Sequence, residues 1–98
     1  AARAKLLGHL GRSKPERPML GGVRMLVKWL FPLTGRHHDG EWRTSKPDTD
    51  NLQKLLKDCM TDVGFWKDDA QVCSEITEKF WALRPGIYIR LEELEEAE

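Results

Sequence analysis

The stretch Asn51-Leu-Gln-Lys-Leu-Leu-Lys-Asp-Cys-Met-Thr-Asp-Val63 carries the strongest folding signal in the chain. Its apolar residues recur at spacings of three and four, which places them on one face of an α-helix, and polar residues fill the other face. Gly64 follows at the position where helices commonly end in the left-handed conformation. We therefore predict an amphipathic helix over residues 51–63 that packs on another layer through Leu52, Leu55, Leu56, Cys59 and Val63.

The other segments predict the layer on which this helix packs. Apolar side chains alternate along residues 23–31, as in a half-buried strand. The pattern along 72–81 fits a helix or a strand, but the turn and alternating segment that follow favour two strands joined as a hairpin. Residues 1–10 are rich in Ala, Lys and Leu and favour a helix. We expect an α+β fold, a mixed β-sheet with strands near 23–31, 72–81 and 86–92 packed by two helices near 1–10 and 51–63.

Length and composition restrict the class of protein. A chain of 98 residues forms one domain with a thin core, so a homodimer would add useful buried surface. Cys59 and Cys73 form no CxxC pair, and we expect both to be small buried residues in a reducing compartment. No run approaches the roughly 18 apolar residues of a membrane span. A soluble, cytoplasmic protein is expected.

Charge is distributed unevenly along the chain, although the formal net charge is zero. Residues 1–46 carry ten Lys or Arg against three Asp or Glu, and residues 47–98 carry six against thirteen. A basic half favours a polyanionic partner, but two opposite halves can equally attract each other within the fold. Residues 32–47 predict a long exposed loop, which usually implies a function. The loop side chains suited to phosphate contacts are Arg36, His37, His38, Arg43 and Lys46.

The segment Lys46-Pro-Asp-Thr-Asp-Asn51 places two carboxylates two residues apart, just before the predicted helix. In an extended chain Asp48 and Asp50 would point the same way and converge on one cation. A third carboxylate lies at Asp68-Asp69, and an immediate chain reversal after the helix would bring it back to the first two. Three hard oxygen ligands suit Mg²⁺, which lowers the pKa of a bound water and neutralises charge on a phosphodiester. Alternatively, these aspartates only cap the helix and form a polar turn.

Two runs together resemble the signature of RusA-type Holliday-junction resolvases. KPDTDNLQKLLKDCM is similar to the family's DxDN-x-x-K element, and GFWKDDAQV is similar to its W-x-DD-x-Q-V element. The resemblance implies a homodimeric crossover junction endodeoxyribonuclease that nicks four-way DNA junctions symmetrically in recombination and repair, often in a phage or prophage. It implies Mg²⁺ as cofactor, with Mn²⁺ as a substitute. The matching positions imply that Asp48, Asp50 and Asp69 are catalytic metal ligands and that Lys54 is catalytic as well.

Some assignments within the motifs have alternatives. Lys54 would hold the scissile phosphate or stabilise developing charge, but it could instead pair with Asp50 or Asp58 along the helix. If the strand over 72–81 extends back to the acidic pair, Asp69 shares its more polar face, and Asp68 is then secondary.

The family's usual N-terminal strand is absent from the sequence. We therefore expect residues 1–98 to form a single, N-terminally incomplete RusA-like domain. Two other functions compete with catalysis: a DNA-binding module without nuclease activity, and a phage structural or interaction protein.

Overall fold

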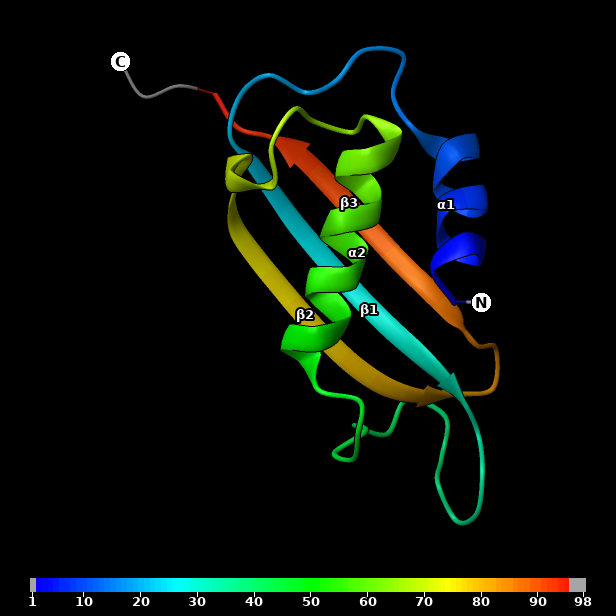
Figure 1. The fold of residues 1–98 in the computed structure, drawn as a ribbon. Coiled ribbons are helices and arrows are strands. Elements are labelled where there is room, and N and C mark those ends of the chain that lie inside the picture. Colours follow the sequence, from blue (N-terminus) through cyan, green and yellow to red (C-terminus); the bar gives the residue numbers. More distant parts are fainter. Residues whose placement is uncertain (1, 96–98) are drawn as a thin grey trace.

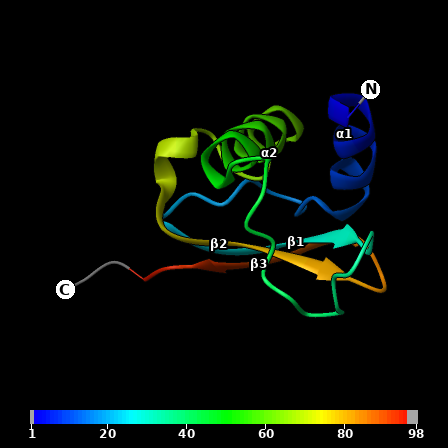
Figure 2. The same cartoon turned by 90° about the horizontal axis from the view of Figure 1, so that it is seen from below.

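A computed structural model describes residues 2–95 as a three-stranded mixed sheet with both long helices on one face (Figures 1 and 2). This confirms the predicted α+β class. Within this part of the chain, neither helix is long and apolar enough to cross a membrane. In chain order the elements are α1 (Ala2–Ser13), β1 (Val23–Pro32), α2 (Thr49–Val63), the short 3-10 helix η1 (Asp69–Gln71), β2 (Val72–Ala82) and β3 (Gly86–Glu93).

The core lies between α2 and the central strand β1. Every second residue of β1 faces the helices, and the burial pattern follows the predicted alternation. From α2 the residues that were expected to form its apolar stripe point into the same layer, and burial raises the pKa of the Cys59 thiol. Cys73, in contrast, is exposed on β2, so its predicted burial is wrong. The fully buried side chains at the centre of this layer are Val23, Met25, Val27, Leu56, Cys59, Met60 and Trp66.

The sheet has the strand order β2-β1-β3, with β1 parallel to β2 and antiparallel to β3. The predicted hairpin between the last two strands is therefore wrong, although both strands exist. Residues 83–85 cross over the end of β1, which separates the two strands. Pairing on both edges satisfies the backbone groups of the central strand β1, and a short turn in the sequence does not distinguish such a crossover from a hairpin.

Residues 32–47 were expected to be an exposed loop without structure of its own, and the central part of this segment instead covers an edge of the sheet. The Arg43 N–H donates to Lys79 O at 3.0 Å, and the Trp81 N–H donates to Glu41 O at 2.8 Å. The Gly40 N–H donates to Trp81 O at 2.8 Å. These bonds satisfy backbone groups along the second half of β2 and fix the loop beside the start of α2.

Gly64 ends α2 in the left-handed conformation, with φ 96°, and its N–H donates to Met60 O and Thr61 O. A Cβ there would meet no atom within 4 Å, so only backbone conformation restricts the position. We predict that Gly64→Ala lowers the free energy of unfolding by about 1 kcal/mol. Gly8→Ala, inside α1 and equally uncrowded, is the control and should raise it by up to about 1 kcal/mol. Urea denaturation measures both, and equal effects would contradict the assignment.

Candidate active site

Asp48 and Asp50 lie at the start of α2, where the sequence placed them. Asp48 is the N-cap residue with an extended backbone, but its side chain makes no capping hydrogen bond. Asp50 is already inside the first turn of the helix, so the extended geometry expected for the pair applies to Asp48 alone. Among residues 2–95, no side-chain hydrogen bond or ion pair engages Asp50. The interpretation of these aspartates as simple helix caps is thus not supported by their contacts.

Both carboxylates act on one cationic group, the ammonium of Lys46. Its Nζ lies 2.9 Å from Asp48 Oδ2. This hydrogen bond, followed by the charges of Asp48 and Asp50, raises the pKa of Lys46. A positive charge therefore already sits against the acidic pair at the exposed surface.

Lys79, on the strand β2, holds the backbone that leads into Asp48. Its Nζ donates to Ser45 O and to Pro47 O, each at 2.7 Å. The backbone on the N-terminal side of Asp48 is thereby fixed to β2. No sequence pattern indicates this role, because it depends on the pairing of a strand with a loop more than thirty residues away.

Lys54 lies one turn beyond Asp50 on the exposed side of α2. Within the described residues, it forms no ion pair with Asp50 or Asp58, which was the alternative to a functional role. Its ammonium group is therefore available to an anion near the start of the helix.

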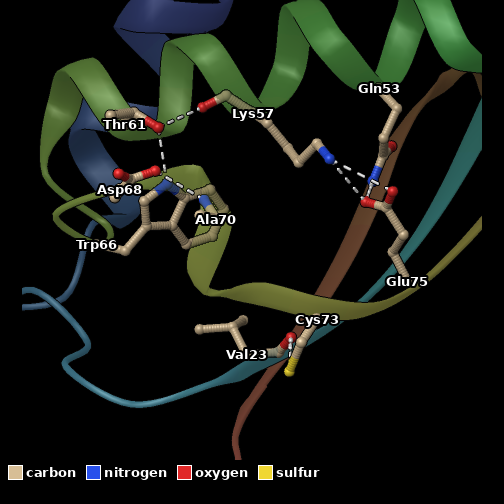
Figure 3. A network of polar contacts seen from close by, with 9 residues as sticks. All are labelled: Val23, Gln53, Lys57, Thr61, Trp66, Asp68, Ala70, Cys73 and Glu75. Atoms are coloured by element: carbon tan, nitrogen blue, oxygen red, sulfur yellow. Dashed lines mark hydrogen bonds and ion pairs between the residues drawn. The ribbon is translucent and has the colours of Figure 1, made fainter.

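In the second acidic pair, the side chain of Asp68 forms a hydrogen bond within the fold, and that of Asp69 forms none within the described residues. Asp68 caps η1: its Oδ1 accepts from Ala70 N at 2.8 Å, as Figure 3 shows. Asp69 is the first residue of η1, and among residues 2–95 no hydrogen bond engages its side chain. The alternation of side chains along β2 does not extend back to Asp68 and Asp69, because η1 intervenes and the register shifts at Cys73. The distinction between the two aspartates now rests on their contacts.

Gln71 fixes this turn to the rest of the fold. Its Oε1 accepts from Lys67 N and Asp68 N at 3.0 and 3.1 Å. Its Nε2 donates to Met19 O and Gly21 O at 2.8 and 3.0 Å, which ties η1 to the chain that enters β1. Gln71 belongs to the second motif, but no sequence pattern indicates this role.

The structure does not bring the two acidic pairs together within one chain. α2 has 15 residues and spans about 21 Å. Figure 1 shows η1 beside the end of this helix, whereas the loop that carries Asp48 lies at its start. Asp69 instead lines an open cavity of about 440 Å³ with residues from the end of α2. In the described part of the chain, no three His, Cys, Asp or Glu side chains are grouped to hold a metal. The expected chain reversal is therefore wrong.

The residues expected to face DNA also divide into two kinds. The Arg43 guanidinium lies over the rings of Phe31 and Trp81, 4.2 and 4.5 Å from their centroids, and donates to Lys46 O. His37 stacks on the same Trp81 ring at 3.9 Å. These two side chains hold the loop against the sheet. Arg36 and His38 are exposed, and within residues 2–95 no hydrogen bond or ion pair engages the side chain of either residue.

Glu41 completes the packing of this loop. Its carboxylate lies 2.7 Å from His37 Nδ1 and accepts from the His38 N–H at 2.9 Å. These two hydrogen bonds, the His37 side chain first, lower the pKa of Glu41. The loop thus has an internal hydrogen bond between His37 and Glu41 in addition to its basic residues.

Comparison with known proteins identifies the family. The chain is 32% identical to the crossover junction endodeoxyribonuclease rusA of Lactococcus phage r1t over 69 residues, which cover 68% of this chain and 53% of that protein. It is 28% identical to the uncharacterized protein YqaN of Bacillus subtilis (strain 168) over 92 residues, which cover 83% of this chain and 64% of that protein. The chain thus spans between half and two thirds of the length of these relatives. A sequence model of the endodeoxyribonuclease RusA family matches residues 1–92, so the chain belongs to this family, as the two motifs predicted.

Proposed function

We propose that this chain is a metal-dependent endodeoxyribonuclease that resolves Holliday junctions by paired symmetric nicks in the cytoplasm. One observation carries the proposal: of the four motif carboxylates, Asp50 and Asp69 form no side-chain hydrogen bond or ion pair within residues 2–95, Asp48 contacts only the exposed ammonium of Lys46, and Asp68 alone is used by the fold. Carboxylates that the fold does not use remain available to a hard divalent cation. Family membership and the activity named for the phage relative support the same conclusion.

The donor set fits a hard divalent cation. Asp48, Asp50 and Asp69 offer carboxylate oxygens near the surface, and their number leaves positions for water and phosphate, as Mg²⁺ requires. When bound, the ion would activate a water and neutralise the phosphodiester, and Mn²⁺ would substitute. Lys46 would then leave Asp48, since the two cations compete for the same oxygens. Lys54 would contact a phosphate from the exposed side of α2.

A homodimer would supply what one chain lacks. Because α2 separates Asp50 from Asp69 by its own length, we propose that each metal site combines Asp48 and Asp50 of one chain with Asp69 of the partner subunit. A twofold axis that places the start of one α2 beside the end of the other would create two such sites. Two equivalent sites are what symmetric nicking of two strands requires.

This arrangement predicts complementation between inactive variants. Asp48→Asn or Asp50→Asn, and separately Asp69→Asn, should each reduce junction cleavage by at least about a hundredfold while binding persists, since a metal ligand is lost without added negative charge. After subunit exchange, a mixture of Asp50→Asn and Asp69→Asn should recover nicking, because each mixed dimer regains one intact site. Glu92→Gln, which alters an exposed ion pair, is the control.

Each outcome of that mixture has a defined meaning. Recovery of activity supports sites that are shared between chains, and no recovery with proven exchange contradicts them. Junction binding that survives EDTA without nicking by the wild-type chain would instead support a DNA-binding module without catalysis.

The contacts of the second acidic pair predict opposite effects of two neighbouring substitutions. Asp68→Ala removes the cap of η1 and should lower the free energy of unfolding by about 1 kcal/mol, with cleavage retained at saturating protein. Asp69→Asn should abolish single-turnover cleavage without loss of stability. Asp68→Asn, which keeps a capping oxygen, is the matched control and should alter neither property strongly. An active Asp69→Asn together with an inert Asp68→Asn would reverse the assignment.

DNA contacts are proposed for the exposed basic side chains Arg36, His38, Lys46 and Lys54, whereas His37 and Arg43 are assigned to the loop's own packing. Arg36→Ala should reduce the salt dependence of junction binding in EDTA by about 0.9 in log K per log salt, for one lost phosphate contact. Arg43→Ala should mainly lower stability, by about 1 kcal/mol, because its cation–π contacts are lost. An unchanged salt slope for Arg36→Ala would show that this residue does not contact phosphate.

A further inference from the structure

The outer edge of β2 has an unpaired middle section. Backbone groups of alternate strand residues point to the same side, and those of Lys79 and Trp81 point outward to the 40–43 loop. Glu75 and Thr77 have the same parity, so their N–H and C=O groups also point outward. Within residues 2–95 no backbone hydrogen bond reaches them on that side. An unpaired edge of this kind is a template for another strand.

The unpaired section has sharp limits. On its N-terminal side the register shift opposite Val23 leaves Cys73 without a partner in β1. On its C-terminal side the Arg43 N–H already occupies Lys79 O. The available edge is therefore residues 74–78, with Ile76 at its centre and 57% exposed. In antiparallel pairing with an identical copy, a twofold axis can pass beside the central residue of such a segment, so that each residue faces its counterpart across the axis.

We propose that residues 74–78 of β2 pair antiparallel with the same residues of a second copy, joining the two three-stranded sheets into one. The inference rests on the homodimer of the proposed function and names the surface that forms it. With the twofold axis at Ile76, Glu75 of each chain faces Thr77 of the other, and the unpaired groups of both residues are satisfied. The exposed Ile76 side chains then meet on the face of the sheet that the helices leave open.

The charges along this edge allow two identical copies of β2 to pair. Two copies of Glu75 approach each other there, which would be unfavourable if both carboxylates lacked a counter-ion. Within its own chain the Glu75 carboxylate accepts from Gln53 Nε2 at 3.1 Å and from Lys57 Nζ at 3.3 Å (Figure 3). Each chain therefore brings a positive charge from α2 with its own Glu75.

The same pairing brings the two halves of the acidic site toward each other. Asp69 precedes the start of β2 by three residues, and Lys79 ties the residue before Asp48 to the far end of β2. Antiparallel pairing places the start of one β2 beside the end of the other. Asp69 of the partner subunit then approaches Asp48 and Asp50 on the helix side. The free edge of β3 does not do this, because β1 separates it from β2.

Cysteine cross-linking tests the seam without reference to activity. In a Cys73→Ser background, with Cys59 buried, Ile76→Cys should give disulfide-linked dimers on mild oxidation. Facing residues of a non-hydrogen-bonded antiparallel pair have Cα atoms about 4.5 Å apart, within the range that disulfides bridge. Tyr88→Cys is the control, since it lies on the same open face, 48% exposed, but on β3. Equal cross-linking at both positions would overturn the seam.

A second variant interrupts the seam. Thr77→Pro removes an outward N–H and leaves the bonds of β2 to β1 in place, so the chain should fold but its dimer dissociation constant should rise by about tenfold or more. Light scattering measures the mass, and circular dichroism checks the fold. If Asp50→Asn and Asp69→Asn complement each other but Ile76→Cys does not cross-link and Thr77→Pro stays dimeric, the seam is wrong and the proposed function stands. If cross-linking occurs without complementation, the seam stands and the shared metal site fails.

Discussion

The packing of α2 against β1 fixes the rest of this structure. The buried residues Leu56, Cys59 and Met60 of the helix form one apolar core with Val23, Met25 and Val27 of the strand. It sets the direction of α2 along the sheet, and therefore the positions of both helix ends. Because each motif of the family adjoins one end of α2, the same contact determines where the acidic residues stand.

A rigid helix between two groups of ligands keeps them a fixed distance apart. No loop adjustment can bring Asp50 to Asp69 while α2 stays helical, since the separation is the length of the helix itself. A twofold axis removes this restriction, because it places the start of one helix beside the end of another. The metal site and the dimer would then form together, and a monomer would be inactive without needing any separate control.

The sequence predicted the elements of this fold better than their contacts. Periodicity was sufficient for α2 and β1, and Gly64 marked the helix end correctly, because these signals depend on neighbours within four residues. The predicted hairpin was wrong because the order of strands depends on pairing between distant segments, and here β1 lies between β2 and β3. Arg43 looked like a DNA contact, yet it packs on Trp81, 38 residues further along the chain, and no local pattern reports that partner.

Asp68 and Asp69 illustrate why local sequence patterns do not predict the roles of individual residues at the site. Asp68 and Asp69 are neighbours of the same residue type, but only Asp68 caps η1. Gln71 holds the same turn in place, because its side chain donates to the carbonyl groups of Met19 and Gly21. These bonds hold the backbone of Asp69 rigidly relative to the entry of β1. A carboxylate that shares a metal with another chain, as proposed for Asp69, needs such a fixed base, because any freedom in η1 would be lost on metal binding and would weaken it. In the proposed site, Asp68 and Gln71 would therefore act as positioning residues for Asp69.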